Sequence, residues 1–117
     1  MGQYFIVVNM TKKEYLHPHA FNDGLKAREF GSGRRTLSAL HALLTKSSEG
    51  GGGDYQDDPT GMIGSWAGDK IWIVGDYDKS KLYNKAEKSY TDISKKIIPI
   101  IKDAYPEDWI SNRMFGD

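Results

Sequence analysis

Residues 3–9 have the sequence QYFIVVN, in which every position from Tyr4 to Val8 is aromatic or β-branched. Such side chains favour extended backbone. Because strand side chains alternate between two faces, a run that is apolar at every position predicts a strand covered on both faces. We therefore expect a central strand over residues 3–9. A turn at residues 10–13 and a short returning strand at residues 14–16 are predicted to follow it.

The clearest helical pattern lies at residues 36–45. Leu37, Leu40 and Leu44 recur there at spacings of three and four residues, which places them on one face of a helix. A second helix is expected near the C-terminus, after residue 91. Pro99 lies inside that stretch and removes a backbone donor, so a kink or a break is predicted there.

Between the two helical regions, residues 62–66 and 70–76 predict two strands joined by a turn, a hairpin spanning residues 62–76. The glycine-rich residues 47–60 are expected to form a mobile loop. This order of elements indicates an α+β fold. We expect a small antiparallel sheet of about four strands packed against two or three helices.

The composition excludes several function classes. The chain has 117 residues, which favours a single domain over residues 1–117, and it has no cysteine for disulfide, thiol or zinc-thiolate chemistry. Basic and acidic residues both number 16, and this balance argues against a protein that binds bulk nucleic acid. No apolar run is long enough to span a membrane. We expect a soluble cytoplasmic protein that uses no cofactor.

A candidate phosphate site lies at residues 31–36, GSGRRT, immediately before the leucine-rich helix. The first turn of a helix exposes unpaired N–H groups and the positive end of the helix dipole. Glycines allow close approach of a phosphate, and arginines bind it bidentately. Ser32, Gly33, Arg34 and Arg35 are therefore predicted to bind phosphate. The alternative is a loop with two solvated arginines.

Residues 50–58 of the glycine-rich loop are predicted to close over this ligand, and Trp66 or Tyr77 is predicted to stack on its base. The ligand-binding residues predicted outside the arginine segment are Gly53, Asp54, Trp66, Asp69 and Tyr77. Core packing is the alternative for Trp66, because one face of a strand is normally buried. A turn-stabilising hydrogen bond is the alternative for Asp69.

His17 and His19 flank Pro18, and an extended backbone would place both imidazoles on one side. A metal ion would need further ligands from carboxylates. The candidates are Glu14, Asp54, Asp57 and Asp58. Local spacing fixes none of them, so no metal site is predicted. The same histidines are the candidates for acid–base catalysis, but no nucleophile is marked as their partner.

Several stretches along the chain carry a family resemblance. They include MGQY at residues 1–4, GSWAGD at 64–69, GDY at 75–77 and YTDIS at 90–94. The chain resembles, as far as Lys102, an uncharacterised family of small bacterial and phage-encoded proteins. The resemblance implies a compact domain of phage or mobile-element origin in a bacterial host, and it implies no activity or catalytic residue. By analogy with small accessory phage proteins, it favours a counter-defence role.

The favoured hypothesis is a non-catalytic binding protein that sequesters a phosphate-bearing, nucleotide-like ligand. The first alternative is a protein–protein inhibitor of a bacterial immune effector. Its basis is a net charge of +3 over residues 1–50 beside −4 over residues 51–80, because complementary surfaces steer association. The second alternative is a small phosphoester-processing enzyme that uses His17 or His19. An open sheet edge beside residues 14–16 would also allow a homo-oligomer.

Overall fold

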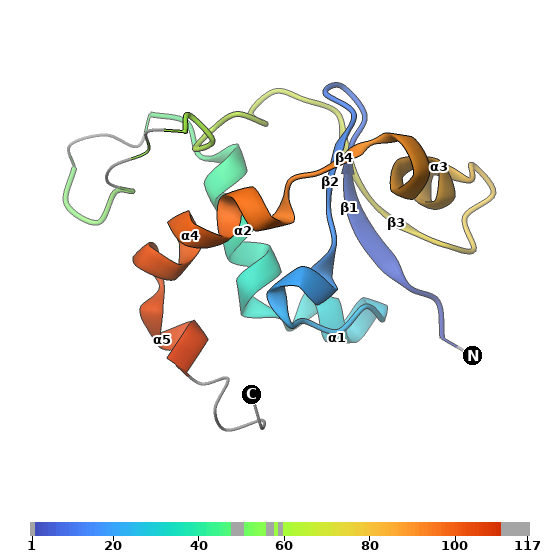
Figure 1. The fold of residues 1–117 in the computed structure, drawn as a ribbon, viewed down its shortest axis with the longest axis horizontal. Helices are drawn as coiled ribbons and strands as arrows, with labels where there is room; N and C mark the ends of the chain where they lie inside the picture. The colour runs from blue at the N-terminus through green and yellow to red at the C-terminus, as the bar shows by residue number, and fades with distance from the viewer. Residues whose placement is uncertain (1, 48–50, 56–57, 59, 111–117) are drawn as a thin grey trace.

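The fold is centred on a four-stranded sheet with the order β3-β1-β2-β4 (Figure 1). The computed structural model describes residues 2–47, 51–55, 58 and 60–110. The strands are β1 (Phe5–Asn9), β2 (Glu14–Leu16), β3 (Ile71–Gly75) and β4 (Thr91–Asp92). The helices are the 3-10 helix η1 (Pro18–Phe21) and the α-helices α1 (Ala27–Gly31), α2 (Arg34–Leu44), α3 (Leu82–Ser89), α4 (Ser94–Ala104) and α5 (Pro106–Ile110).

The α+β class is confirmed, and so is the central strand. Ile6, Val7 and Val8 of β1 have no exposed surface, because helices cover both faces of the sheet. Figure 1 shows α3 on one side of the sheet and α1, α2, α4 and α5 on the other. On the α3 side, Ile6 and Val8 pack with Leu82 and other α3 residues. On the opposite side, Val7 belongs to a larger core formed mainly by α2 and α4.

The predicted hairpin at residues 62–76 does not form. Residues 63–68 are a series of turns, and β3 pairs with β1 instead of with a neighbour in sequence. Gly64 and Gly68 have positive φ angles of 76° and 87°, which is left-handed backbone and incompatible with a strand. The turn segment is attached to the end of α2, where Gly64 N donates to Ala42 O at 2.9 Å and Trp66 N donates to Leu43 O at 2.9 Å.

The sheet also differs from the prediction in its topology. β2 pairs with β4 in parallel, so the sheet is mixed and not antiparallel throughout. This pairing places β2 in the interior, between β1 and β4, and the open edge predicted beside residues 14–16 is therefore absent. The longer of the two edge strands is β3.

The second helical region is confirmed. The predicted break is wrong, because α4 continues through Pro99, and the alternative of a kink stays a prediction. Pro99 is exposed, so water can solvate the carbonyl that loses its helical donor. Every helix among the described residues is too short or too polar to cross a bilayer. The mobile loop at residues 47–60 stays a prediction, because residues 48–50, 56–57 and 59 lie outside the described residues.

Candidate functional site

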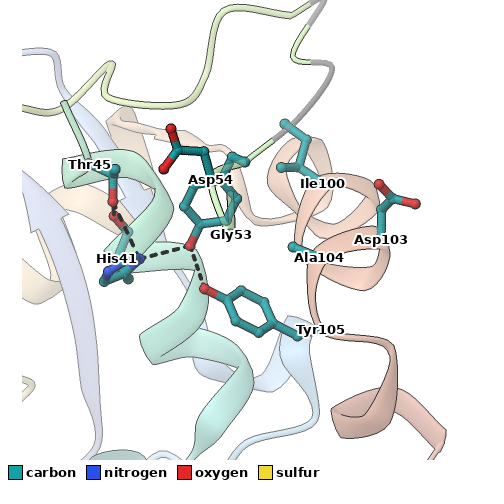
Figure 2. Close-up of a pocket in the computed structure, with 9 residues that line it drawn as sticks. His41, Thr45, Gly53, Asp54, Ile100, Asp103, Ala104 and Tyr105 are labelled. Carbon is teal, nitrogen blue, oxygen red and sulfur yellow. Dashed lines mark hydrogen bonds between the residues drawn. The ribbon is translucent and has the colours of Figure 1, made fainter. Parts of the chain in front are cut away.

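A pocket of about 380 Å³ lies between α2, residues 53–55 and the end of α4 (Figure 2). Its lining residues are His41, Thr45, Gly53, Asp54, Tyr55, Ile100, Asp103, Ala104 and Tyr105. The volume is within the range of about 300–1,000 Å³ that is usual for small-molecule sites. Gly53 and Asp54 are two of the predicted ligand-binding residues, and the structure places both here.

A chain of hydrogen bonds crosses this pocket (Figure 2). The Tyr55 hydroxyl lies 2.8 Å from His41 Nδ1 and 2.7 Å from the Tyr105 hydroxyl. The rings of Tyr55 and Tyr105 meet edge to face, with 6.1 Å between their centroids. Burial, followed by the hydrogen bond to Tyr105, raises the pKa of Tyr55 far above its ordinary value. Through these two hydrogen bonds, the Tyr55 phenol holds residues 53–55 against α2 and the end of α4.

The helices position these groups through simple spacing. His41 and Thr45 are four residues apart, so they lie on one face of α2, and Thr45 Oγ1 donates to His41 O at 2.6 Å. Tyr105 follows α4 directly, and its N–H donates to Ile101 O at 2.8 Å. Because α2 and α4 pack against each other, His41 and Thr45 lie across the pocket from the C-terminal end of α4.

The pocket is acidic. Asp54 lines it from the loop segment, and Asp103 lines it from the last turn of α4. Among the described residues that line it, none is lysine or arginine. Asp54 Oδ2 accepts a hydrogen bond from Gly51 N at 2.9 Å, and the carboxylates of Asp54 and Asp103 point away from each other (Figure 2). The net negative charge of the lining and its two phenol rings still favour a ligand that carries positive charge, because a cation is attracted by carboxylates and by aromatic faces.

Arg35 is not part of this pocket. It is 6% exposed, and its guanidinium donates to main-chain carbonyls: Nε and Nη2 to Asp108 O at 3.1 and 2.8 Å, and Nη1 to Phe21 O at 3.1 Å. The guanidinium carbon also lies 4.4 Å from the centroid of the Trp109 ring. Arg35 therefore joins α2 to α5 and to η1, and the donors predicted to bind phosphate have intramolecular partners.

Arg34 points in a different direction, with a side chain that is 82% exposed and a contact of 3.4 Å to Asp108 Oδ1. The start of α2 already receives an anion from the chain itself. Asp23 Oδ2 accepts hydrogen bonds from both the N–H and the hydroxyl of Thr36. Gly33 permits this approach, since a Cβ there would lie 2.6 Å from the Asp23 carboxyl carbon. Phosphate binding by Ser32, Gly33, Arg34 and Arg35 stays a prediction, and these contacts give it no support.

The remaining predicted ligand residues lie apart from the pocket. Trp66 has no exposed surface, and its Nε1 donates to Glu14 Oε1 at 2.8 Å, so it belongs to the core. Asp69 Oδ2 accepts hydrogen bonds from Asn9 Nδ2 at 2.8 Å and from Lys12 Nζ at 2.6 Å. Asp69 thus ties the segment before β3 to the end of β1. Tyr77, which follows β3, is 60% exposed.

Asp69→Asn is expected to destabilise the chain in a pH-dependent way. The hydrogen bond from Asn9, together with the contact to Lys12, lowers the pKa of Asp69 from its ordinary value of 3.8. A lowered folded-state pKa contributes stability above the unfolded-state pKa, and this contribution is lost as the pH falls through the folded-state pKa. Urea unfolding from pH 7 downward should show the two chains differing at pH 7 and converging below about pH 3.8. A difference that does not change with pH would contradict this assignment.

The two candidate histidines are close together. The rings of His17 and His19 have centroids 5.7 Å apart, and His17 Nδ1 accepts from His19 N at 3.3 Å. The other ring nitrogen of His17 lies 3.5 Å from Glu87 Oε2 on α3. The described part of the chain holds no group of three His, Asp or Glu side chains that could bind a metal, and Asp57 lies outside it.

Sequence reasoning missed most of the pocket. His41, Thr45, Asp103 and Tyr105 were not predicted to bind a ligand. The four-residue spacing of His41 and Thr45, which places His41 beside Leu37 on the predicted helix, is the local signal that points to them. Nothing local indicates that α4 would place Tyr105 beside Tyr55, since that contact joins residues fifty positions apart.

Comparisons of the chain with family models, with curated proteins and with solved structures find no match.

Proposed function

We propose that this chain is a non-catalytic binding protein whose pocket between α2 and α4 takes a small organic cation, such as an amine. One observation carries the proposal. The lining holds Asp54, Asp103 and two tyrosine rings, without lysine or arginine among its described residues. The acidic lining would attract an ammonium group, and an apolar or aromatic body would pack on Tyr55, Ile100 and Tyr105.

The ligand proposed here is positively charged, whereas the ligand expected at Arg34 and Arg35 is a negatively charged phosphate group. A phosphate in the acidic pocket would be repelled by Asp54 and Asp103, and Arg35 is already bonded to main-chain carbonyls. The family resemblance implies a small phage-encoded protein in the bacterial cytoplasm. A pocket of this kind is compatible with the sequestration of a host metabolite by such a protein. The inhibitor and phosphoester alternatives stay predictions.

A thermal-shift panel tests the proposal with spermidine and benzylamine as cationic probes, and with AMP and inorganic phosphate as anionic probes. We expect the amines to raise the melting temperature and the anions to leave it unchanged. At ten times the Kd, a ligand stabilises the folded state by about 1.4 kcal/mol, which shifts the melting temperature of a small domain by several degrees.

Asp103→Asn keeps the shape of the pocket and removes one charge, so it should weaken amine binding about fivefold. Glu107→Gln is the matched control, because it removes a carboxylate from an exposed position on α5 outside the lining, and it should bind as the natural chain does. Stabilisation by AMP or phosphate alone would overturn the charge argument. No shift with any probe would exclude the pocket as a site for these ligands.

A further inference from the structure

The outer edge of β3 is open. β3 is the last strand in the sheet order, and among the described residues no strand lies beyond it. In its antiparallel pairing with β1, Met10 N donates to Lys70 O and Asp76 N donates to Tyr4 O, both at 2.9 Å. The even-numbered residues of β3 therefore bond to β1. By alternation, Ile71, Ile73 and Gly75 direct their N–H and C=O groups outward.

The side chains along this edge are apolar on both faces of the sheet. Trp72 is 46% exposed, and Lys70 Nζ lies 5.3 Å above its ring. On the other face, Ile73 is 54% exposed and borders an apolar hollow of about 130 Å³. The hollow is lined by Phe5, Ala27, Phe30, Gly31, Leu37 and Ile73. Edge strands normally carry charge, proline or a bulge that blocks pairing, and residues 71–75, IWIVG, contain neither proline nor charge.

The charges that flank the edge are complementary to the same edge in a second copy. Consider two β3 strands that pair antiparallel with the two-fold axis at Ile73. Each residue then faces the residue of the partner strand that lies equally far from Ile73 on the other side of it. Ile73 then faces Ile73, Trp72 faces Val74, and Lys70 faces Asp76, whose Oδ1 also accepts from Tyr4 N at 3.0 Å. A two-fold interface must be self-complementary, and this register places opposite charges at both ends of an apolar strand.

We propose that a second copy of this chain docks on β3 and forms a two-fold dimer with a sheet continuous through both copies. The Ile73 N–H and C=O groups form the central pair of hydrogen bonds. Gly75 is buried and its carbonyl already accepts from Asp78 N at 3.1 Å, so the new pairing is confined to the exposed part of β3 around Ile73. β4 offers a poorer edge, because it is only two residues long. None of the residues that line the acidic pocket lies in β3, so the dimer is independent of the proposed ligand.

Sedimentation velocity of the full chain tests this proposal through a charge swap. Lys70→Glu places like charges opposite each other at both ends of the interface, and so does Asp76→Lys. The dimer dissociation constant of each variant alone should therefore be at least about tenfold higher than that of the natural chain. Mixed together, the two variants place opposite charges at both ends again and should form a heterodimer. Lys79→Glu changes the same charge at an exposed site outside β3 and should stay dimeric.

Ile73→Pro gives a second test. It removes an outward N–H that does not bond to β1, so the sheet can keep its internal pairing while the dimer loses its central hydrogen bonds. Circular dichroism confirms that each variant is folded. A natural chain that stays monomeric at every concentration would overturn the proposal. A folded variant pair that stays monomeric on mixing, or an Ile73→Pro variant that dimerises like the natural chain, would also overturn it.

Discussion

Arg35→Ala is expected to lower the free energy of unfolding by about 3 kcal/mol or more. The buried guanidinium satisfies the carbonyls of Phe21 and Asp108, and it contacts the ring of Trp109. Removing it takes the donor away from the buried Phe21 carbonyl and removes the hydrogen bonds that join α5 to α2. Arg35→Lys should also be destabilising, because one ammonium group cannot reproduce the planar fork that reaches both carbonyls.

Arg34→Ala is the matched control, since it removes a neighbouring arginine that is 82% exposed and has one contact of 3.4 Å. We expect a change of no more than about 0.5 kcal/mol for it, measured by urea unfolding. Equal small effects of the two substitutions would contradict the structural role of Arg35. Such a result would indicate that both arginine side chains are solvated and available to a ligand.

Trp66→Ala is expected to cost about 3–5 kcal/mol, because Trp66 is among the largest side chains without exposed surface. Its side chain packs from the turn segment into the core beside α2, and its Nε1 donates to Glu14 Oε1 at 2.8 Å. Trp66→Phe keeps an aromatic ring and loses this hydrogen bond. It should therefore fall between the natural chain and the alanine variant.

Trp72→Ala is the control for the loss of stability expected in Trp66→Ala. Trp72 is 46% exposed on the open edge, so its loss should change the stability of the monomer much less than the loss of Trp66. Chemical unfolding of both variants at low protein concentration separates these values from any dimer. A Trp66→Ala variant as stable as Trp72→Ala would show that Trp66 is not a core residue.

The sequence predicts the elements whose signal is local. The apolar run at residues 3–9 and the leucine spacing at 36–45 each specify one element, and the structure has a buried strand and a helix there. Residues 62–66 have strand-like composition, but Gly64 and Gly68 adopt left-handed backbone and Trp66 N bonds to the end of α2. Tertiary contacts therefore override the local preference, and the partner of β3 becomes β1.

The candidate site shows the same limit. The GSGRRT segment predicts a phosphate ligand at the start of a helix, whereas the structure shows the Asp23 carboxylate, thirteen residues before Thr36 in the chain, bonded there. The acidic pocket depends on the packing of α2 against α4, which brings Tyr105 to Tyr55. No residue spacing encodes that contact, so composition and motifs could supply only Gly53 and Asp54 of its lining.

The most direct measurement of the central claim is an NMR titration of the natural chain with benzylamine, followed through backbone amide and tyrosine ring signals. We expect saturable shifts at His41, Asp54, Tyr55 and Tyr105, with unchanged signals at Arg34, and about fivefold weaker saturation in Asp103→Asn. Signals that stay unmoved at the pocket, or that move there with AMP and not with the amine, would contradict a cation-binding site between α2 and α4.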